Sequence, residues 1–176
     1  SGYSVSLSSD GSRVAIGAYG NDGVNGANSG HVRVYQWSGS AWTQLGADID
    51  GEATGDNSGY SVSLSSDGSR VAIGAYLNDS VNGQNSGHVR VYQWSGSAWT
   101  QLGADIDGEA AADYSGWSVS LSSDGSRVAI GAYLNDDNGS NYGRVGVYQW
   151  SASATTQPRA YIEGEDAAVL SGWWES

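Results

Sequence analysis

Residues 1–19 read SGYSVSLSSDGSRVAIGAY, and copies of this stretch organise the whole chain. The stretch returns unchanged at 58–76 and with one change at 115–133, where Trp117 stands in place of Tyr60. A shorter piece, Ser171-Gly172-Trp173, opens a fourth copy, so the copies start at residues 1, 58, 115 and 171. A nearly fixed period in this range is typical of repeat architectures, in which each unit buries its faces against its neighbours.

Each repeat contains four stretches that we expect to form antiparallel strands. In the first repeat they are residues 4–8, 13–19, 31–37 and a less regular 41–49. Alternating apolar and polar residues are typical of strands. Asp10-Gly11, between the first two, predicts a type I′ hairpin turn with positive φ at both residues. The small residues Ala15 and Gly17 predict that a second layer approaches this strand closely.

Four strands per repeat of about 57 residues predict an all-β fold of three four-stranded antiparallel propeller blades. The blades are residues 1–57, 58–114 and 115–170, and residues 171–176 are the start of a fourth repeat or a C-terminal tail. A β-solenoid coil would be shorter, and an immunoglobulin-like sandwich needs about seven strands without an internal repeat. The 27 glycines and the scarcity of long, straight-chain residues leave little room for helix.

Charge and composition exclude several classes of partner. The formal net charge is −12, with seven Arg and no Lys, which argues against binding to nucleic acid or to an anionic membrane surface. The absence of Cys excludes disulfides and thiolate chemistry. No apolar run approaches the roughly 18 residues of a membrane span, and no signal peptide is apparent, so we expect no membrane insertion.

Three short motifs of the repeat resemble a known family. Gly2-Tyr3-Ser4-Val5 and Gly17-Ala18-Tyr19 are similar to the FG…GAP pattern of FG-GAP repeats, and residues 30–35 are similar to that family's G-x-V-x-V-Y strand. The family forms the seven-bladed propeller of integrin α subunits and recurs in secreted bacterial proteins. The resemblance therefore implies a non-enzymatic extracellular binding or adhesion module, secreted or at the cell surface.

The family's calcium loop, D-x-D-x-D-G, is not preserved. The corresponding residues 6–11 read SLSSDG, so only Asp10 supplies a carboxylate, and calcium binding at this turn is not expected. Tyr or Trp replaces the family's Phe, and Tyr19 stands where the family has Pro.

Variation between the repeats indicates a ligand face. In a four-stranded meander, the long loop 20–30 and the connection 50–57 lie at the same end of a blade. The first two repeats differ only at 20/77, 23/80, 27/84, 54/111, 55/112 and 57/114, all in these segments. Variable loops on a constant scaffold are a common location for binding. The candidate ligand-face residues are Asn21, Asp22, Asn25, Glu52, Asp56, Asn78, Asp79, Asn82, Glu109, Asp113, Asp136, Asp137, Asn138 and Tyr142.

Two other functions remain open, a lectin-like propeller that uses Tyr and Trp near this face and, less favoured, a hydrolase. We predict no catalytic residue, because His31 and His88 read as ordinary strand histidines. No cofactor is required, but hard oxygen ligands suit weak calcium binding, and the same residue types also stabilise turns. The candidate calcium ligands are Asp22, Asn25, Asp79, Asn82, Asp136 and Asp137. Zinc is not expected, because there is no Cys and no paired His.

Three blades would form an open arc, whereas propellers typically close with 4–8 blades. We therefore expect either a homodimer that closes a six-bladed ring, with Trp173 and Trp174 at the seam, or an excised arc whose missing blades the parent protein supplies. Its ligand would be a protein or a glycan. Two apolar sets compete for the open face of the first blade, one with Val5, Leu7, Val14 and Ile16 and the other with Tyr19, Tyr35 and Trp37. The repeated aromatics Tyr35/Tyr92/Tyr148 and Trp37/Trp94/Trp150 are predicted to pack between blades.

Overall fold

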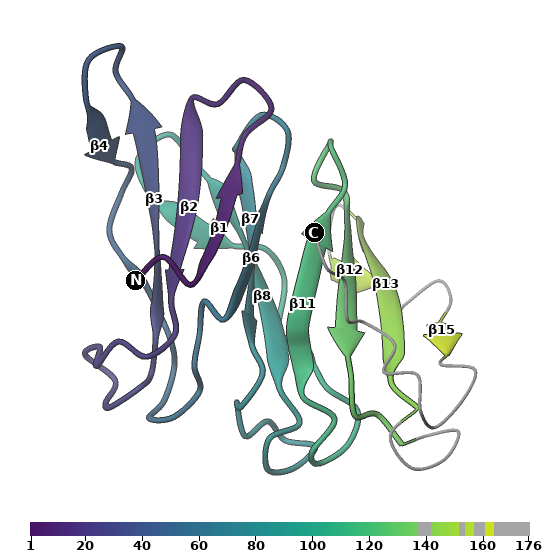
Figure 1. Cartoon of the computed structure of the whole chain (residues 1–176). Helices are drawn as coiled ribbons and strands as arrows, with labels where there is room; N and C mark the ends of the chain where they lie inside the picture. Colours follow the sequence, from purple (N-terminus) through teal and green to yellow (C-terminus); the bar gives the residue numbers. More distant parts are fainter. Residues whose placement is uncertain (137–141, 152–153, 157–160, 164–176) are drawn as a thin grey trace.

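The computed structural model describes residues 1–136, 142–151, 154–156 and 161–163 (Figure 1). Every regular element within these ranges is a β-strand, and the strands form three antiparallel sheets that stand side by side as propeller blades. Within the same ranges, no helix is long and apolar enough to span a membrane. The predicted fold class is confirmed.

The three blades share one topology, in which the strands follow one another from the inner to the outer edge. Blade 1 contains β1 (Ser4–Leu7), β2 (Arg13–Ala18), β3 (His31–Trp37), β4 (Trp42–Gln44) and β5 (Ile49–Asp50). Blade 2 contains β6 (Ser61–Leu64), β7 (Arg70–Ala75), β8 (His88–Trp94), β9 (Trp99–Gln101) and β10 (Ile106–Asp107). Blade 3 contains β11 (Ser115–Leu121), β12 (Arg127–Ala132), β13 (Arg144–Ser151), β14 (Ala154–Thr156) and β15 (Tyr161–Glu163).

The outer strand differs from the prediction of one continuous element at 41–49. It is split into β4 and β5, which both pair with β3. The break coincides with Gly46, whose φ of 80° lies in the left-handed region and takes the chain out of the extended conformation. A side chain at Gly46 would also collide with the Trp94 ring of blade 2, so the break creates space for the next blade.

The turn at Asp10-Gly11 is a hairpin as predicted, but the predicted type I′ geometry is wrong. Only Gly11 has a positive φ, 69°. Asp10 instead uses its carboxylate, which accepts hydrogen bonds from the Ser8 hydroxyl at 2.7 Å and from the Ser12 N–H at 2.9 Å. These hydrogen bonds lower the pKa of Asp10 to about 2, and the bond from Ser8 has the largest effect. Asp10, the single carboxylate at the place of the family's calcium loop, therefore closes the turn.

Strand register gives each blade two different faces. Val5 lies opposite Ile16, Leu7 opposite Val14, and Val14 opposite Tyr35, so these side chains share one face. We call this the leading face, because in blade 2 the same face packs against the preceding blade. The opposite, trailing face carries Ala15, Gly17, Val32, Val34 and Ile49.

The open face of blade 1 is its leading face, with Val5 64% and Leu7 61% exposed. The first of the two predicted apolar sets is therefore the exposed one. The grouping of Tyr35 with Tyr19 was wrong, because Tyr35 pairs in register with Val14 and joins the leading face.

The hydrophobic core is divided between two joints, which are the interfaces between consecutive blades. Joint 1 packs the trailing face of blade 1 against Val62, Leu64, Val71, Ile73 and Tyr92 of blade 2. Joint 2 repeats this arrangement between the trailing face of blade 2 and the leading face of blade 3, with Tyr148 in the place of Tyr92. The predicted packing of aromatics between blades is confirmed for Tyr92 and Tyr148. It is wrong for Tyr35, which lies on the open leading face of blade 1, and for Trp37, which packs against Trp42 of its own blade. Neither face of a blade could bury its apolar residues without a neighbour.

Backbone contacts set the spacing at each joint. A Cβ at Gly17 would overlap the carbonyl oxygen of Gly59, which confirms the predicted close approach of a second layer. Ser6 Oγ accepts a 2.9 Å hydrogen bond from the N–H of Leu64. Ser63 accepts the same bond from Leu121 at 2.9 Å, so joint 2 repeats joint 1.

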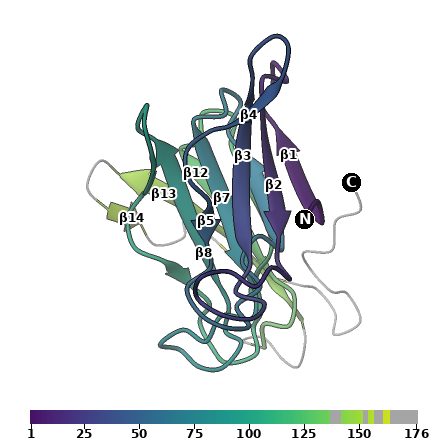
Figure 2. The same ribbon diagram turned by 90° about the vertical axis from the view of Figure 1, so that its left-hand side faces the viewer.

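The long loops between the second and third strands gather at one end of the blades, below the strands in Figures 1 and 2. We call this end the loop face. The hairpin turns between the first two strands of each blade lie at the opposite end (Figure 1).

Candidate functional site

The loop face is held together by backbone hydrogen bonds between the two segments predicted to form it. The N–H groups of Gly55, Asn57 and Ser58 donate to the carbonyls of Ala27, Asn28 and Ser29 at 2.9, 3.0 and 3.0 Å. Blade 2 repeats the pattern between its connection 107–114 and its loop 77–87. The two segments lie at the same end of the blade, as predicted, and these hydrogen bonds join them into one surface.

Most of the predicted ligand-face residues stabilise this surface. Asp22 accepts a 2.9 Å hydrogen bond from the N–H of Asn28, and Asp79 repeats it with Asn85 at 2.8 Å. The side-chain amide of Asn25 donates to the Gly51 carbonyl at 2.6 Å, and Asn82 repeats this with Gly108 at 2.7 Å. Their oxygen atoms are thus spread along two loops, and calcium binding by these residues stays a prediction.

Asp56 and Asp113 link neighbouring blades. Asp56 Oδ2 accepts hydrogen bonds from the Ala53 N–H at 2.9 Å and from the Asn78 amide of blade 2 at 3.0 Å. Asp113 makes the same pair of bonds in joint 2, including 2.9 Å to Asn135. Both carboxylates are buried, with exposed fractions of 3%. They fix the loop of one blade on the connection of the preceding blade.

A groove of about 210 Å³ runs along this contact at joint 1. Its walls are the connection of blade 1 and the loop of blade 2. The nine lining residues are Ala53, Thr54, Gly55, Asp56, Leu77, Asn78, Asp79, Gln84 and Asn85. Thr54, Gly55, Leu77 and Gln84 are at positions where the first two repeats differ. We call this the loop groove, and it is the concave part of the loop face where the repeats have diverged.

Two of the variable positions have backbones that disfavour the residues present in blade 2. The first repeat has Gly55 and Asn57, which tolerate the left-handed φ of 87° and 56° observed there. The second repeat keeps the geometry but has Ala112 and Tyr114, with φ of 65° and 55°. Non-glycine residues in this region cost of order 1 kcal/mol or more each. These substitutions therefore oppose local backbone stability.

Glu52, one of the predicted ligand-face residues, instead takes part in a charged contact that crosses joint 1 beside the loop groove, and this contact was not predicted. Glu52 of blade 1 faces His88 and Arg90 of blade 2, at 3.9 Å to His88 Nδ1 and 3.3 Å to Arg90 Nη1. Arg90 also donates to the Asp50 carbonyl at 2.7 Å. We call this contact between a glutamate and the next blade's cation the interblade clamp. Burial of the imidazole lowers the pKa of His88 to about 4, and the positive charge of Arg90 makes a smaller contribution in the same direction.

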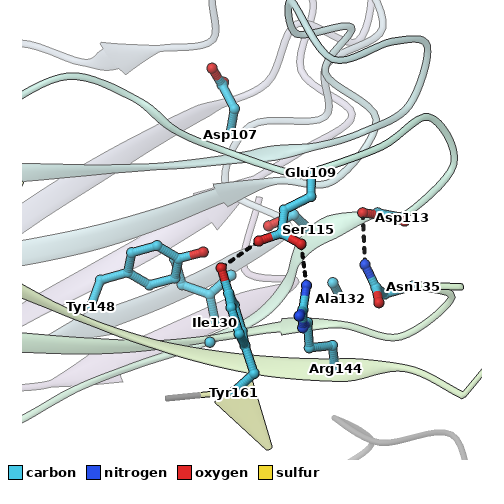
Figure 3. Close-up of a pocket in the computed structure, with 12 residues that line it drawn as sticks. Asp107, Glu109, Asp113, Ser115, Ile130, Ala132, Asn135, Arg144, Tyr148 and Tyr161 are labelled. Atoms are coloured by element: carbon cyan, nitrogen blue, oxygen red, sulfur yellow. Dashed lines mark hydrogen bonds and ion pairs between the residues drawn. The ribbon is translucent and has the colours of Figure 1, made fainter. Parts of the chain in front are cut away.

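Joint 2 has a clamp of different composition (Figure 3). Glu109 bridges Arg144 and the hydroxyl of Tyr161, and the Arg144 guanidinium stacks 3.4 Å from the centre of the Tyr161 ring. Arg144 stands at the position of His88, and Gly146 at that of Arg90. A cavity of about 20 Å³ lies here, bounded by Gly146, Tyr148 and Asp107 among others. This volume is enough for about one water molecule.

Blade 1 has the same strand residues but no preceding blade within the structure. Arg33 forms a two-point ion pair with Asp48 of its own blade, with Nε–Oδ1 and Nη2–Oδ2 distances of 2.9 and 2.8 Å. The bonds from Arg33 lower the pKa of Asp48 to about 2. Burial and Arg33 also lower the pKa of His31.

Among the residues that the structure describes, two groups of potential metal ligands lie at these charged contacts, one at the Arg33–Asp48 pair of blade 1 and one at the joint 1 clamp. They are His31 with Asp48 and Asp50, and Glu52 with His88 and Asp105, and the ligand atoms of each group lie within 4.8 Å of one another. In both groups a neighbouring guanidinium, of Arg33 or Arg90, already contacts a carboxylate. This fixed positive charge competes with a cation, so the geometry favours ion pairing over metal ligation.

A continuous series of aromatic rings follows the loop end of the inner strands. Each ring lies with its centre 4.3–6.1 Å from the next, in tilted or edge-to-face contacts. We call it the aromatic ladder, and it contains Tyr3, Tyr19, Tyr60, Tyr76, Tyr114, Trp117 and Tyr133. Tyr3, at its open end, is 57% exposed and donates to the Tyr60 hydroxyl at 3.0 Å. Six of its rings occupy the positions where the motifs depart from Phe and Pro, and the seventh, Tyr114, comes from the connection before blade 3.

The remaining predicted residues are only partly covered by the structure. Asn21 and Asp136 are exposed on loops, and Tyr142 is half-buried just before β13. Asp137 and Asn138, the seam residues Trp173 and Trp174, and the side chain of Trp150 lie outside the described residues.

The interblade clamps had one signal in the sequence that could have revealed them. His31 and Arg33 recur as His88 and Arg90, but the third repeat changes both positions together, to Arg144 and Gly146. A paired change of this kind, which keeps one guanidinium while moving it by two residues, indicates a shared partner.

Fold and motifs together define a set of β-propeller blades. More specifically, the chain belongs to the FG-GAP repeat family, whose model matches residues 47–92 and 104–148, more than half of the chain. The predicted resemblance is therefore confirmed. FG-GAP repeats are typical of extracellular proteins. No curated protein matches the chain in sequence.

Solved structures with propeller-like folds resemble the three blades. A putative 6-phosphogluconolactonase from Bacteroides fragilis matches 90% of this chain with a TM-score of 0.59 and 10% identity, and one from Bacteroides uniformis matches 90% with 0.55 and 11%. Hydrazine synthase from Kuenenia stuttgartiensis matches 93% with 0.54 and 12%. The matched regions are 38%, 39% and 36% of those chains, so this chain spans less than two fifths of their length. Such low identities show the fold alone.

Proposed function

We propose that this protein is a non-enzymatic extracellular binding module, in which the propeller blades are the scaffold and the loop face holds a protein or glycan ligand. The observation that carries the proposal is the loop groove. Four of its nine lining residues differ between two repeats whose strands are identical. Membership of a family typical of extracellular proteins supports a secreted or cell-surface location.

The backbone geometry of the variable positions adds to this support. Neutral drift tends to preserve residues that suit a left-handed backbone, yet Gly55 and Asn57 correspond to Ala112 and Tyr114 in blade 2. Substitutions that cost stability are frequent where function is gained. The two carboxylates of the groove, Asp56 and Asp79, accept hydrogen bonds from loop N–H groups, which is a structural role.

Exchange of groove residues between repeats tests the proposal. Fluorescently labelled protein would be applied to a glycan array and to cells, with and without calcium. The double variant Leu77→Gly with Gln84→Ala gives blade 2 the residues of blade 1, and we expect binding to fall at least about tenfold. The matched control, Gly20→Leu with Ala27→Gln, makes the reverse exchange in blade 1 outside the groove. Equal binding by both variants, or no binding to any array spot or cell, would count against the proposal.

A lectin-like function is the second candidate, and the aromatic ladder favours it. Aromatic rings with hydroxyl groups offer both stacking surface and hydrogen bonds to sugars. In this case Tyr3→Ser, at the exposed end of the ladder, should abolish glycan-array binding, while the groove exchange at Leu77 and Gln84 should not. Calcium stays part of the proposal only if a chelator weakens binding in the same assay.

A further inference from the structure

The aromatic rings of this chain are all of types that lose an electron readily. The sequence has 11 Tyr and 8 Trp but no Phe, and it also has no Met and no Cys. A phenylalanine would fill nearly the same volume as a tyrosine without a hydroxyl group that needs a hydrogen-bond partner when it is buried. Packing between the blades therefore does not by itself explain why every ring of the aromatic ladder is Tyr or Trp.

Within the ladder, the first ring of each blade contacts the first ring of the next blade. The ring centres of Tyr3 and Tyr60 lie 4.9 Å apart across joint 1, and those of Tyr60 and Trp117 lie 4.8 Å apart across joint 2. In joint 1 the two phenols also share a hydrogen bond, because the Tyr3 hydroxyl donates to the Tyr60 hydroxyl at 3.0 Å. In joint 2 the second ring is an indole, so joint 1 has a pair of first-ring phenols and joint 2 does not.

We propose that Tyr3 and Tyr60 are a modification site, at which oxidation joins the two rings into a dityrosine bridge between blade 1 and blade 2. This modification is separate from ligand binding at the loop groove and does not require it. Hydroxyl oxygens 3.0 Å apart bring the neighbouring ring carbons close enough to couple after small rotations of the two side chains. Tyr60 is only half-buried, so an oxidant in solution can reach the pair. Because the contact lies within joint 1, the bridge needs no second copy of the chain.

The bridge forms when each phenol loses one electron and its hydroxyl proton. The oxidant is a one-electron acceptor of the haem-peroxidase type, which passes the two electrons and two protons to hydrogen peroxide and reduces it to water. The two phenoxyl radicals form one carbon–carbon bond between the ring positions next to the oxygens. Each ring becomes aromatic again when the hydrogen on its coupled carbon moves to its own oxygen. The product therefore keeps both hydroxyl groups and is lighter than the unmodified chain by two hydrogen atoms.

A bridge at this place would have the effect that a disulfide has in many secreted proteins. It would join residues 57 positions apart in two different blades, in a chain that has no Cys to form a disulfide. Covalent links of this kind stabilise a protein mainly by restricting the unfolded chain, and the effect grows with the length of the closed loop. Tyr60 also contacts the rings of Tyr76 and Trp117, so the bridge would fix a ring that both joints share.

Peptide mapping after oxidation tests the site. The full chain would be treated in dilute solution with a haem peroxidase and hydrogen peroxide, and then unfolded and cleaved by trypsin after each arginine. We expect residues 1–13 and 34–70 to be recovered as one linked fragment with dityrosine fluorescence. Tyr3→Phe keeps the ring but removes the phenol, so this fragment should be lost. Tyr35→Phe removes the other tyrosine of 34–70, which lies outside the ladder, and is the matched control that should leave the fragment unchanged.

Trp117→Tyr tests the same chemistry as a gain of function. It gives joint 2 the first-ring phenols of joint 1, so a linked fragment of 34–70 with 91–127 should appear after oxidation. A midpoint of urea unfolding that rises on oxidation of the wild type, but not of Tyr3→Phe, would support a bridge between the blades. The proposal would be overturned by dityrosine that forms only between copies of the chain, by a linked fragment that survives in Tyr3→Phe, or by oxidation without any linked fragment. Glycan or cell binding is measured separately, so failure of the bridge would leave the proposed binding function untouched.

Discussion

Joint 1 and joint 2 solve the same electrostatic problem with different residues. In joint 1 the cation that faces the glutamate of the preceding blade is Arg90, two residues after His88. In joint 2 it is Arg144, which stands at the His88 position, and Gly146 replaces the arginine. Both joints place a guanidinium opposite a glutamate. The arginine can therefore occupy either of the two strand positions, provided that the residue at the other position leaves room for it.

Blades 1 and 2 have identical strands, but their arginines form different ion pairs. Arg33 pairs with Asp48 in its own blade, whereas Arg90 turns away from the equivalent Asp105 to meet Glu52 of the preceding blade. The difference comes from the neighbour alone. Substitutions at matched positions therefore measure what a neighbouring blade contributes.

The largest expected effect is at the apolar centre of joint 1. Leu64→Ala removes a side chain that is 7% exposed, and we expect the free energy of unfolding to fall by about 2–5 kcal/mol. Leu7→Ala removes the same side chain from an identical strand where it is 61% exposed, and the expected loss is below about 0.5 kcal/mol. Urea unfolding monitored by Trp fluorescence, at a dilution that keeps the chain monomeric, measures both. Equal losses would contradict the assignment of the open face.

The next effect is the pH dependence that His88 gives to joint 1. His88 titrates near pH 4 when folded, against 6.5 when unfolded, so between these values the unfolded chain binds more protons. Stability should therefore be complete above about pH 6.5 and fall by about 2–3 kcal/mol as the pH drops to 4. The raised pKa of Glu52, caused by burial, acts in the opposite direction, so the readout is the difference between wild type and His88→Gln across this window.

His31→Gln is the control for this measurement. Burial lowers the pKa of His31 as well, but it lies on the open side of blade 1 and faces no glutamate from a preceding blade within the described structure. Its replacement should change the slope less than that of His88. A wild-type slope that survives in His88→Gln would place the pH dependence elsewhere.

The sequence predicted the blades well because strand alternation and a constant period are local properties. It also predicted which segments are variable loops and which are constant strands, because the differences between the first two repeats can be read directly from the sequence. The clamps were not predicted, because Arg33 and Arg90 have identical flanking residues and differ only in what lies across the joint. The paired change to Arg144 and Gly146 in the third repeat was the one signal for them. The break of the outer strand at Gly46, where a side chain would collide with the Trp94 ring of the next blade, was not predicted either. Contacts between repeats depend on residues far apart in the chain, so a local sequence pattern does not predict them.

Removal of the glutamate charge should cost more in joint 1 than in joint 2. Glu52→Gln leaves Arg90, which is 5% exposed, with its Asp50 carbonyl contact but without a countercharge, and we expect a loss of about 2 kcal/mol. Glu109→Gln should cost about 1 kcal/mol, because Arg144 keeps its stacking on Tyr161. Asp48→Asn, which unpairs the more exposed Arg33, should cost less than about 0.5 kcal/mol and is the surface control. Chemical denaturation ranks the three, and a reversed order would show that burial does not set the strength of the clamp.

The smallest effect, and the most specific, is the coupling between positions 144 and 146. Arg144→His alone takes the guanidinium from Glu109, and Gly146→Arg alone adds a second one where the cavity is only about 20 Å³ and a Cβ would lie 2.7 Å from the Tyr148 ring. Each single change should therefore destabilise the protein by about 1–2 kcal/mol. Together they restore the His-Val-Arg-Val order of blade 2, in which the Arg90 guanidinium lies 5.7 Å from the centre of the Tyr92 ring. Because Tyr148 can then take the place of Tyr92, the double variant should lose about 1 kcal/mol less than the two singles combined. Strictly additive losses in this double-mutant cycle would show that the two positions changed independently, and the parallel between the two joints would then be coincidental.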